Sequence, residues 1–161
     1  MPKPNPLRLI MQSELPPVSV QRRLPYRPSQ REVHRVYDLL NRYVFDNCLT
    51  RPKIELGRTK GYWGMCYGSW TETRTGTYVT IKLSDKWFCP QWFVNTLAHE
   101  MVHQYQWDII SPAREDSGKE WLMSHGPSFF MFRDELEKYG ISLKTAHGRK
   151  RWFKHQNFNK C

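Results

Sequence analysis

One predicted helix places three polar side chains in apolar surroundings. Residues 90–109 form this helix, with Pro90 in its first turn, and its apolar residues recur on more than one face. The sequence therefore predicts a helix buried on most sides. His99, Glu100 and His103 lie within it and form the pattern HExxH. Burying two histidines and a glutamate together is costly unless they are paired or bound to a metal ion.

The spacing of these three residues indicates a metal site with a base beside it. Residues four apart in a helix lie about 40° from each other around its axis, so His99 and His103 can share one ion. Glu100 is rotated from His99 by about 100°, close enough to reach a water on that ion without being a ligand. A chance HExxH on a solvated helix is the alternative, which the apolar flanks disfavour. The pattern predicts one bound Zn²⁺.

A catalytic zinc ion usually has three protein ligands and leaves its fourth position to water. His125 is the favoured third ligand, because it directly precedes the Gly-Pro start of a predicted helix. A fixed helix entry orients a ligand better than a loop does. Carboxylates of the preceding polar loop stay open as alternatives: Glu115, Asp116 and Glu120.

Helix and strand signals alternate in the rest of the central region. A capping box of Ser29 and Glu32 starts a helix predicted over residues 30–47. Another helix is predicted from Pro127 to a stop at Gly140. Strands are predicted over residues 53–56, 61–70 and 77–83, with a turn at 72–76. The expected fold is α+β, with three main helices packed on a short, mostly antiparallel sheet.

Three glycines interrupt the second predicted strand, at Gly61, Gly64 and Gly68. Glycine inside a strand often marks a bulge or a site that another backbone approaches closely. An edge strand beside the HExxH helix could also hold an extended peptide by adding it to the sheet.

The excess positive charge lies at the two ends of the chain. The net charge is +10, and residues 140–161 hold six basic residues and no acidic one. Residues 1–31 hold six basic residues and one acidic residue. Seven of the eleven prolines fall in residues 1–28, which predicts an extended arm outside the core. We therefore expect an arm over 1–29, a domain over 30–147 and a tail over 148–161.

A basic arm and tail suit a polyanion such as DNA, although basic termini can also simply aid solubility. In the tail, aromatic rings could stack on exposed bases while cations hold phosphates. The alternative is that the two rings pack back onto the domain. The candidate nucleic-acid contacts are Arg149, Lys150, Arg151, Trp152 and Lys154, with Phe153 beside them.

Other function classes are disfavoured by the sequence. The four cysteines are scattered and form no CxxC pair, which is typical of a reducing, cytoplasmic compartment. No apolar stretch is long enough to span a membrane, and the first residues do not resemble a secretory signal.

Four segments of the chain resemble the SprT-like metalloproteases, which include the Spartan DNA–protein crosslink proteases. They are NTLAHEMVHQY at 95–105, SHGPSF at 124–129, GMC at 64–66 and TIKLS at 80–84. The resemblance runs from about residue 31 to 147. It implies His99, His103 and His125 as ligands of one Zn²⁺, Glu100 as the catalytic acid and base, and a small zincin-like domain.

Many relatives in that family carry a zinc ribbon or a separate DNA-binding region after the protease domain. Residues 148–161 match neither. Any DNA contacts of this chain are therefore expected from the arm, the tail and aromatic loops.

The expected activity is that of a zinc-dependent endopeptidase acting on DNA-bound or nucleic-acid-associated proteins. Zinc held by three imidazoles lowers the pKa of bound water to about 7. Glu100 would take the water proton and return it to the leaving amine. Candidates for a second electrophile are Tyr62, Tyr105 and His147.

Two other functions stay open. One is a maturation or general protease whose arm docks on a larger protein assembly. The other is a non-catalytic, zinc-stabilised interaction protein, in which Glu100 would have no role.

Overall fold

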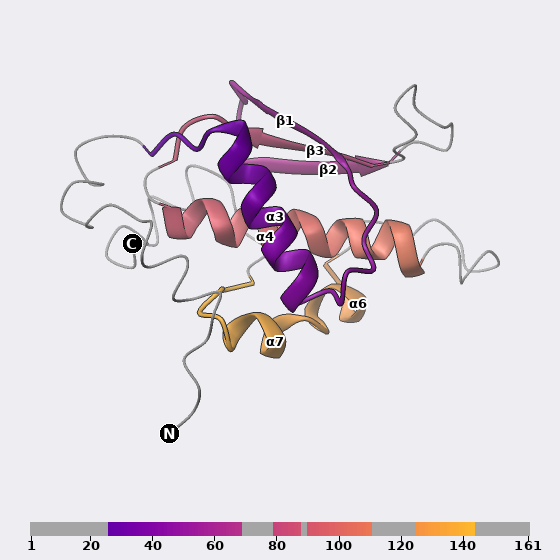
Figure 1. Ribbon diagram of the computed structural model, residues 1–161. Helices are drawn as coiled ribbons and strands as arrows, with labels where there is room; N and C mark the ends of the chain where they lie inside the picture. Colours follow the sequence, from indigo (N-terminus) through magenta and orange to yellow (C-terminus); the bar gives the residue numbers. More distant parts are fainter. Residues whose placement is uncertain (1–25, 69–78, 88–89, 111–124, 144–161) are drawn as a thin grey trace.

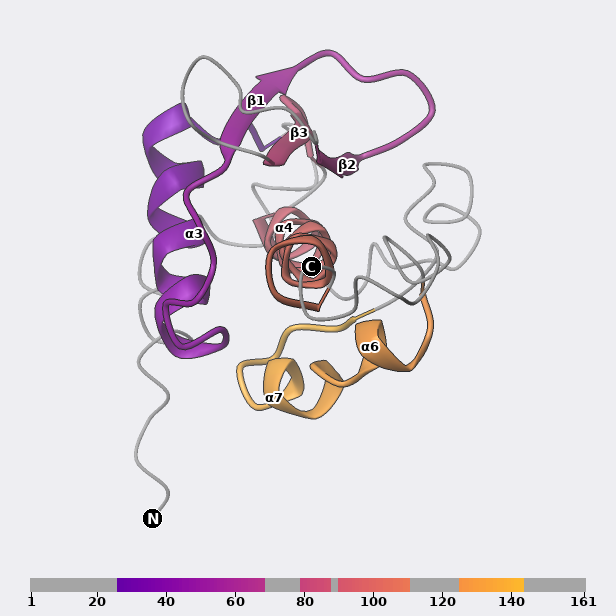
Figure 2. The same ribbon diagram turned by 90° about the vertical axis from the view of Figure 1, so that its right-hand side faces the viewer.

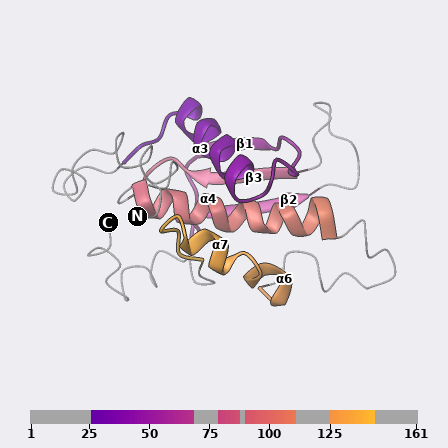
Figure 3. The same cartoon turned by 60° about the horizontal axis from the view of Figure 1, so that its bottom comes forward.

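The computed structural model describes residues 26–68, 79–87, 90–110 and 125–143. Helix α4 (Pro90–Tyr105) lies at the centre of this part of the chain. Figures 1 and 2 show the sheet on one side of α4, helix α3 (Gln30–Tyr43) on another, and the short helices α6 (Pro127–Phe130) and α7 (Arg133–Glu137) on a third. The turned view in Figure 3 shows α6 and α7 along the side of α4 away from the strands. The α+β class is confirmed.

The enclosure of α4 explains its composition. Every residue of this helix except Gln91 and Tyr105 is buried, including the three polar residues of the HExxH pattern. A helix with neighbours on several sides has no solvated face, so apolar residues occur all around its axis. The predicted burial of this helix is confirmed.

The sheet has three strands, in the order β1 (Lys53–Gly57), β3 (Val79–Ser84), β2 (Gly64–Gly68). β2 runs antiparallel to β3, but β1 runs parallel to it. The prediction of a mostly antiparallel sheet is therefore wrong, and the sheet is mixed. The reason is that β1 and β2 run in opposite directions, and β3 lies between them and pairs antiparallel with β2. Its pairing with β1 is therefore parallel.

Two of the three glycines of the second predicted strand allow close approach by side chains. A Cβ atom on Gly64 would lie 2.9 Å from Thr96 Cγ2, and one on Gly68 would overlap the ring of Trp107. The predicted close approach to these glycines is confirmed, but the approaching atoms belong to side chains and not to another backbone. Gly61 lies before β2 and has a φ of +80°, which favours glycine.

Helix α3 begins as predicted and ends earlier. Ser29 Oγ accepts from the Glu32 backbone N–H at 3.1 Å, and the Glu32 carboxylate accepts from the Ser29 N–H at 2.9 Å. The helix ends at Tyr43 rather than at residue 47, because the chain turns through left-handed conformations at Asp46 (φ 51°) and Asn47 (φ 57°).

The two other predicted helices also differ in detail. α4 continues as a π-helical turn, η1 (Gln106–Ile110), rather than as regular α-helix. The helix predicted from Pro127 is divided into α6 and α7, and between them the ring of Phe132 packs against Phe45 and Tyr105. Gly140, with a φ of +76°, follows α7 where the sequence predicts the helix stop.

The end of the predicted arm contacts the domain. Tyr26 and Trp87 exchange backbone hydrogen bonds of 2.7 and 2.8 Å, and the Tyr26 ring lies 5.9 Å from that of Phe93. Residues 1–25 lie outside the described part of the chain, as do the predicted turn at 72–76 and the tail. None of the described helices is both long and apolar enough to cross a membrane.

Candidate metal centre

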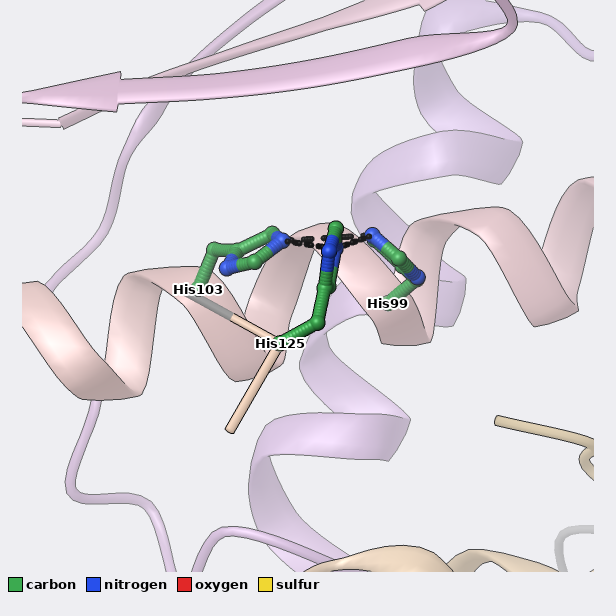
Figure 4. A group of neighbouring side chains, drawn as sticks. All are labelled: His99, His103 and His125. Carbon is green, nitrogen blue, oxygen red and sulfur yellow. Dashed lines mark hydrogen bonds between the residues drawn. The ribbon is translucent and has the colours of Figure 1, made fainter. Parts of the chain in front are cut away.

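Three imidazoles converge on one point beside α4. His99 and His103 project from this helix, and His125 comes from the segment just before α6 (Figure 4). The Nε2 atom of His103 lies 3.2 Å from that of His99 and 3.1 Å from that of His125. The third distance, between His125 Nε2 and His99 Nε2, is 3.2 Å. The structure therefore brings together the two helical histidines and the favoured third one.

The triangle of nitrogens fits a tetrahedral metal ion. Two nitrogens bound to zinc at about 2.0–2.1 Å with tetrahedral angles lie about 3.3 Å apart. The three observed distances of 3.1–3.2 Å approach that value. Protons on all three inward-facing nitrogens would crowd one another, whereas three lone pairs can share one cation. These residues could hold one metal ion.

A single apolar ring supports all three imidazoles. Phe129, which is fully buried, has its ring centroid 4.7 Å from that of His99, 4.9 Å from His103 and 4.8 Å from His125. Two of these contacts are edge-to-face, a favourable geometry for aromatic pairs. Phe129 therefore limits the positions that the three imidazole rings can adopt.

One buried polar side chain, that of Gln106, holds the ring of His103. Its Nδ1 lies 2.8 Å from Gln106 Oε1, and Gln106 Nε2 donates to Ser128 Oγ at 2.9 Å. An amide oxygen can only accept, so His103 carries its proton on Nδ1 and leaves the Nε2 lone pair free for a metal.

The environment favours neutral imidazoles. Burial lowers the pKa of His103 to about 4, although its hydrogen bond to Gln106 opposes this change. Burial also lowers the pKa of His125. His99 and His103 are buried, whereas His125 is exposed. Neutral imidazole is the form that binds metals.

Glu100 lies in the interface between α4 and β2. Its side chain is almost fully buried, and its carboxyl accepts a hydrogen bond from the Cys66 backbone N–H. Burial raises the pKa of Glu100 to about 8, and the Cys66 N–H opposes this change. A Cβ atom on Gly64 would lie 3.0 Å from Glu100 Oε1, so the glycine leaves space for the carboxyl. Strand β2 therefore determines the position of the acid.

One other predicted site residue packs against the hydrophobic core. Tyr105 packs its ring against Phe45 and Phe132 and has a core role. Other candidates lie outside the described residues: Glu115, Asp116, Glu120, His147, Arg149, Lys150, Arg151, Trp152 and Lys154.

Two residues of the centre were missed from sequence. Gln106 is three residues after His103, where helical neighbours meet, and that spacing was the available signal. The contact of Phe129 with all three imidazoles depends on how α6 docks, which no local pattern reveals.

No protein-family model matches the chain, and neither a curated protein nor a solved structure is significantly similar to it.

Proposed function

We propose that this chain is a zinc-dependent endopeptidase of the SprT-like type. The observation that carries the proposal is the convergence of His99, His103 and His125 Nε2 atoms within 3.1–3.2 Å of one another. A buried carboxyl, Glu100, stands beside one of these ligands on the same helix. Three imidazole ligands, with an acid next to one of them in the sequence, are typical of metal-assisted peptide hydrolysis.

The roles of the residues follow from their protonation. Three imidazoles would hold the ion, which when bound supplies Lewis acidity that activates water and polarises the scissile carbonyl. Glu100, with a pKa raised to about 8 by burial, is able both to take a proton and to give it back near neutral pH. It would accept the proton of the attacking water and deliver it to the amine that leaves when the peptide bond breaks.

Strand β2 supports binding of an extended peptide. Among the described strands it pairs with β3 alone, so its other edge can receive a substrate segment. The backbone N–H of Cys66 in the same strand donates to the Glu100 carboxyl, so a peptide bound along β2 would lie near the proposed catalytic acid.

The proposed substrates are DNA-bound or nucleic-acid-associated proteins. The support is the charge of the chain, which is +10 in total and whose positive excess lies in the first 31 and the last 22 residues. Cations concentrated at two ends attract a polyanion and would raise the local concentration of proteins bound to it.

The experiment measures zinc content and cleavage of a DNA-binding protein, with single-stranded DNA added and withheld. We expect one zinc per chain and cleavage that increases with DNA. The matched control is Glu100→Gln, which should keep the zinc and cut about 100-fold to 10,000-fold more slowly.

Each departure from this result has a different meaning. Equal cleavage with and without DNA would remove the DNA-directed substrate and favour a general or maturation protease. Zinc binding with no cleavage of any protein would favour a zinc-stabilised interaction protein. Cleavage by Glu100→Gln at the wild-type rate would refute the role of this residue.

A further inference from the structure

Gln106 joins the two chain segments that supply the metal ligands. It is the first residue of η1, directly after α4, and none of its surface is exposed. Its oxygen lies 2.8 Å from His103 Nδ1, and its nitrogen donates to Ser128 Oγ at 2.9 Å. Ser128 is in the first turn of α6, three residues after His125. One side chain thus bonds a ligand of the helix and the element that carries the third ligand.

The contact with His103 selects a tautomer. Neutral imidazole has one N–H, on either nitrogen, and only the unprotonated nitrogen can bind a metal. Because Gln106 presents its oxygen, the proton is held on Nδ1 and the lone pair of Nε2 faces His99 and His125.

The contact with Ser128 fixes α6 relative to α4. His125 is exposed and lies 20 positions after the end of α4 in the sequence, directly before α6, so its position depends on how α6 docks. The ring of Phe129 makes an apolar contact with His125. The hydrogen bond from Gln106 to Ser128 also restricts the orientation of α6.

We propose that Gln106 is a positioning residue of the metal centre, which sets the His103 tautomer and holds His125 in register with α4. This inference rests on the proposed function, since it assigns Gln106 a role in the same centre. The inference predicts that removing the Gln106 amide weakens metal binding by more than the accompanying loss of fold stability would.

Gln104 provides a matched control. It is also fully buried and lies two residues away, but it bonds Tyr37, Thr50 and Asp108 instead of a histidine. Gln106→Leu and Gln104→Leu each remove one buried amide of the same size. A structural role alone would give both variants the same effect on zinc binding.

The first measurement is zinc affinity by competition with a chelator, on the full chain. We expect Gln106→Leu to bind zinc about 10-fold to 100-fold more weakly, which is typical of losing such an outer partner. Ser128→Ala should lose less zinc affinity than Gln106→Leu, because Gln106 still contacts His103. Gln106→Glu should recover most of the affinity, because a carboxylate accepts from both His103 and the Ser128 hydroxyl. Equal losses in Gln104→Leu and Gln106→Leu would overturn the inference.

The second measurement needs no metal. Nitrogen-15 NMR of metal-free protein reports which ring nitrogen of His103 carries the proton. We expect the Nδ1–H form in wild type, Gln104→Leu and Gln106→Glu, and a mixture of tautomers in Gln106→Leu. An unchanged tautomer in Gln106→Leu would overturn the inference.

These results separate the inference from the proposed function. A wild-type chain that binds zinc but cleaves no protein would refute the peptidase, while the affinity and tautomer results would still decide the role of Gln106.

Discussion

The ring of Phe129 meets the ring of His125 edge to face, with centroids 4.8 Å apart and planes at 83°. Phe129 follows His125 by four residues and is fully buried, whereas His125 is exposed. The same ring touches His99 and His103 on α4, so an apolar side chain connects all three proposed ligands. The geometry of the centre therefore depends on core packing as well as on polar contacts.

Phe129→Ala should weaken both stability and metal binding. Removing a fully buried phenylalanine ring costs about 3–5 kcal/mol, and the three imidazoles would lose their common support. Urea unfolding and chelator competition measure the two effects. Met131→Ala, at a site that is 58% exposed, is the control and should change stability by about 0.5 kcal/mol or less. Wild-type zinc affinity in folded Phe129→Ala would show that the ring does not position the ligands.

His125→Ala should abolish stoichiometric zinc binding, because two imidazoles alone leave the ion incompletely held. Its control is His34→Ala on α3, whose ring contacts Gln30 and Arg51 rather than the other histidines. Metal analysis after dialysis measures the difference. Stoichiometric zinc in His125→Ala would instead assign the third ligand to one of the carboxylates at Glu115, Asp116 or Glu120.

Gly64→Ala should displace Glu100 and β2. The added methyl would lie 2.9 Å from Thr96 Cγ2 and 3.0 Å from Glu100 Oε1, closer than normal contact, so we expect a loss of about 1–3 kcal/mol. The cleavage rate of the folded variant should also fall, because the carboxyl of Glu100 is displaced. Gly57→Ala in β1 is the control, since nothing lies within 4 Å of its added methyl. Equal cleavage rates for these two variants would contradict the role of Gly64.

Local patterns in the sequence predicted the parts of the centre that depend on local geometry. The four-residue spacing of His99 and His103 follows from helix periodicity, and the Ser29 capping box involves residues three apart. The Gly-Pro pair after His125 predicts a helix start there, and α6 begins at Pro127. The glycine at position 64 indicated close approach, but not which side chain approaches.

Features that depend on distant parts of the chain were not predictable in this way. The parallel pairing of β1 with β3 joins residues that are 27 apart, such as Ile54 and Ile81, and no local pattern specifies it. The apolar stripe after Pro127 fits one continuous helix equally well. The break between α6 and α7 appears only when Phe132 packs against Phe45, far away in the sequence. Tertiary packing overrides helix propensity at such sites.

Tyr37→Phe should destabilise the fold without weakening metal binding. The Tyr37 hydroxyl donates to Gln104 Oε1 at 2.8 Å and lies 3.0 Å from Thr50 O, in a buried network between α3 and the end of α4. Without it the buried Gln104 oxygen loses its donor, which costs about 1–3 kcal/mol.

Tyr139→Phe is the control for this change, because its partly exposed hydroxyl lies 3.4 Å from Tyr43 O and contributes little. Urea unfolding should separate the two variants, while zinc affinity should stay at the wild-type value in both. The Tyr37 hydroxyl bonds Gln104, whereas Gln106 contacts the proposed ligand His103, so the two glutamines have different partners at one helix end. A loss of zinc affinity in Tyr37→Phe would show that the two networks are coupled through this helix end.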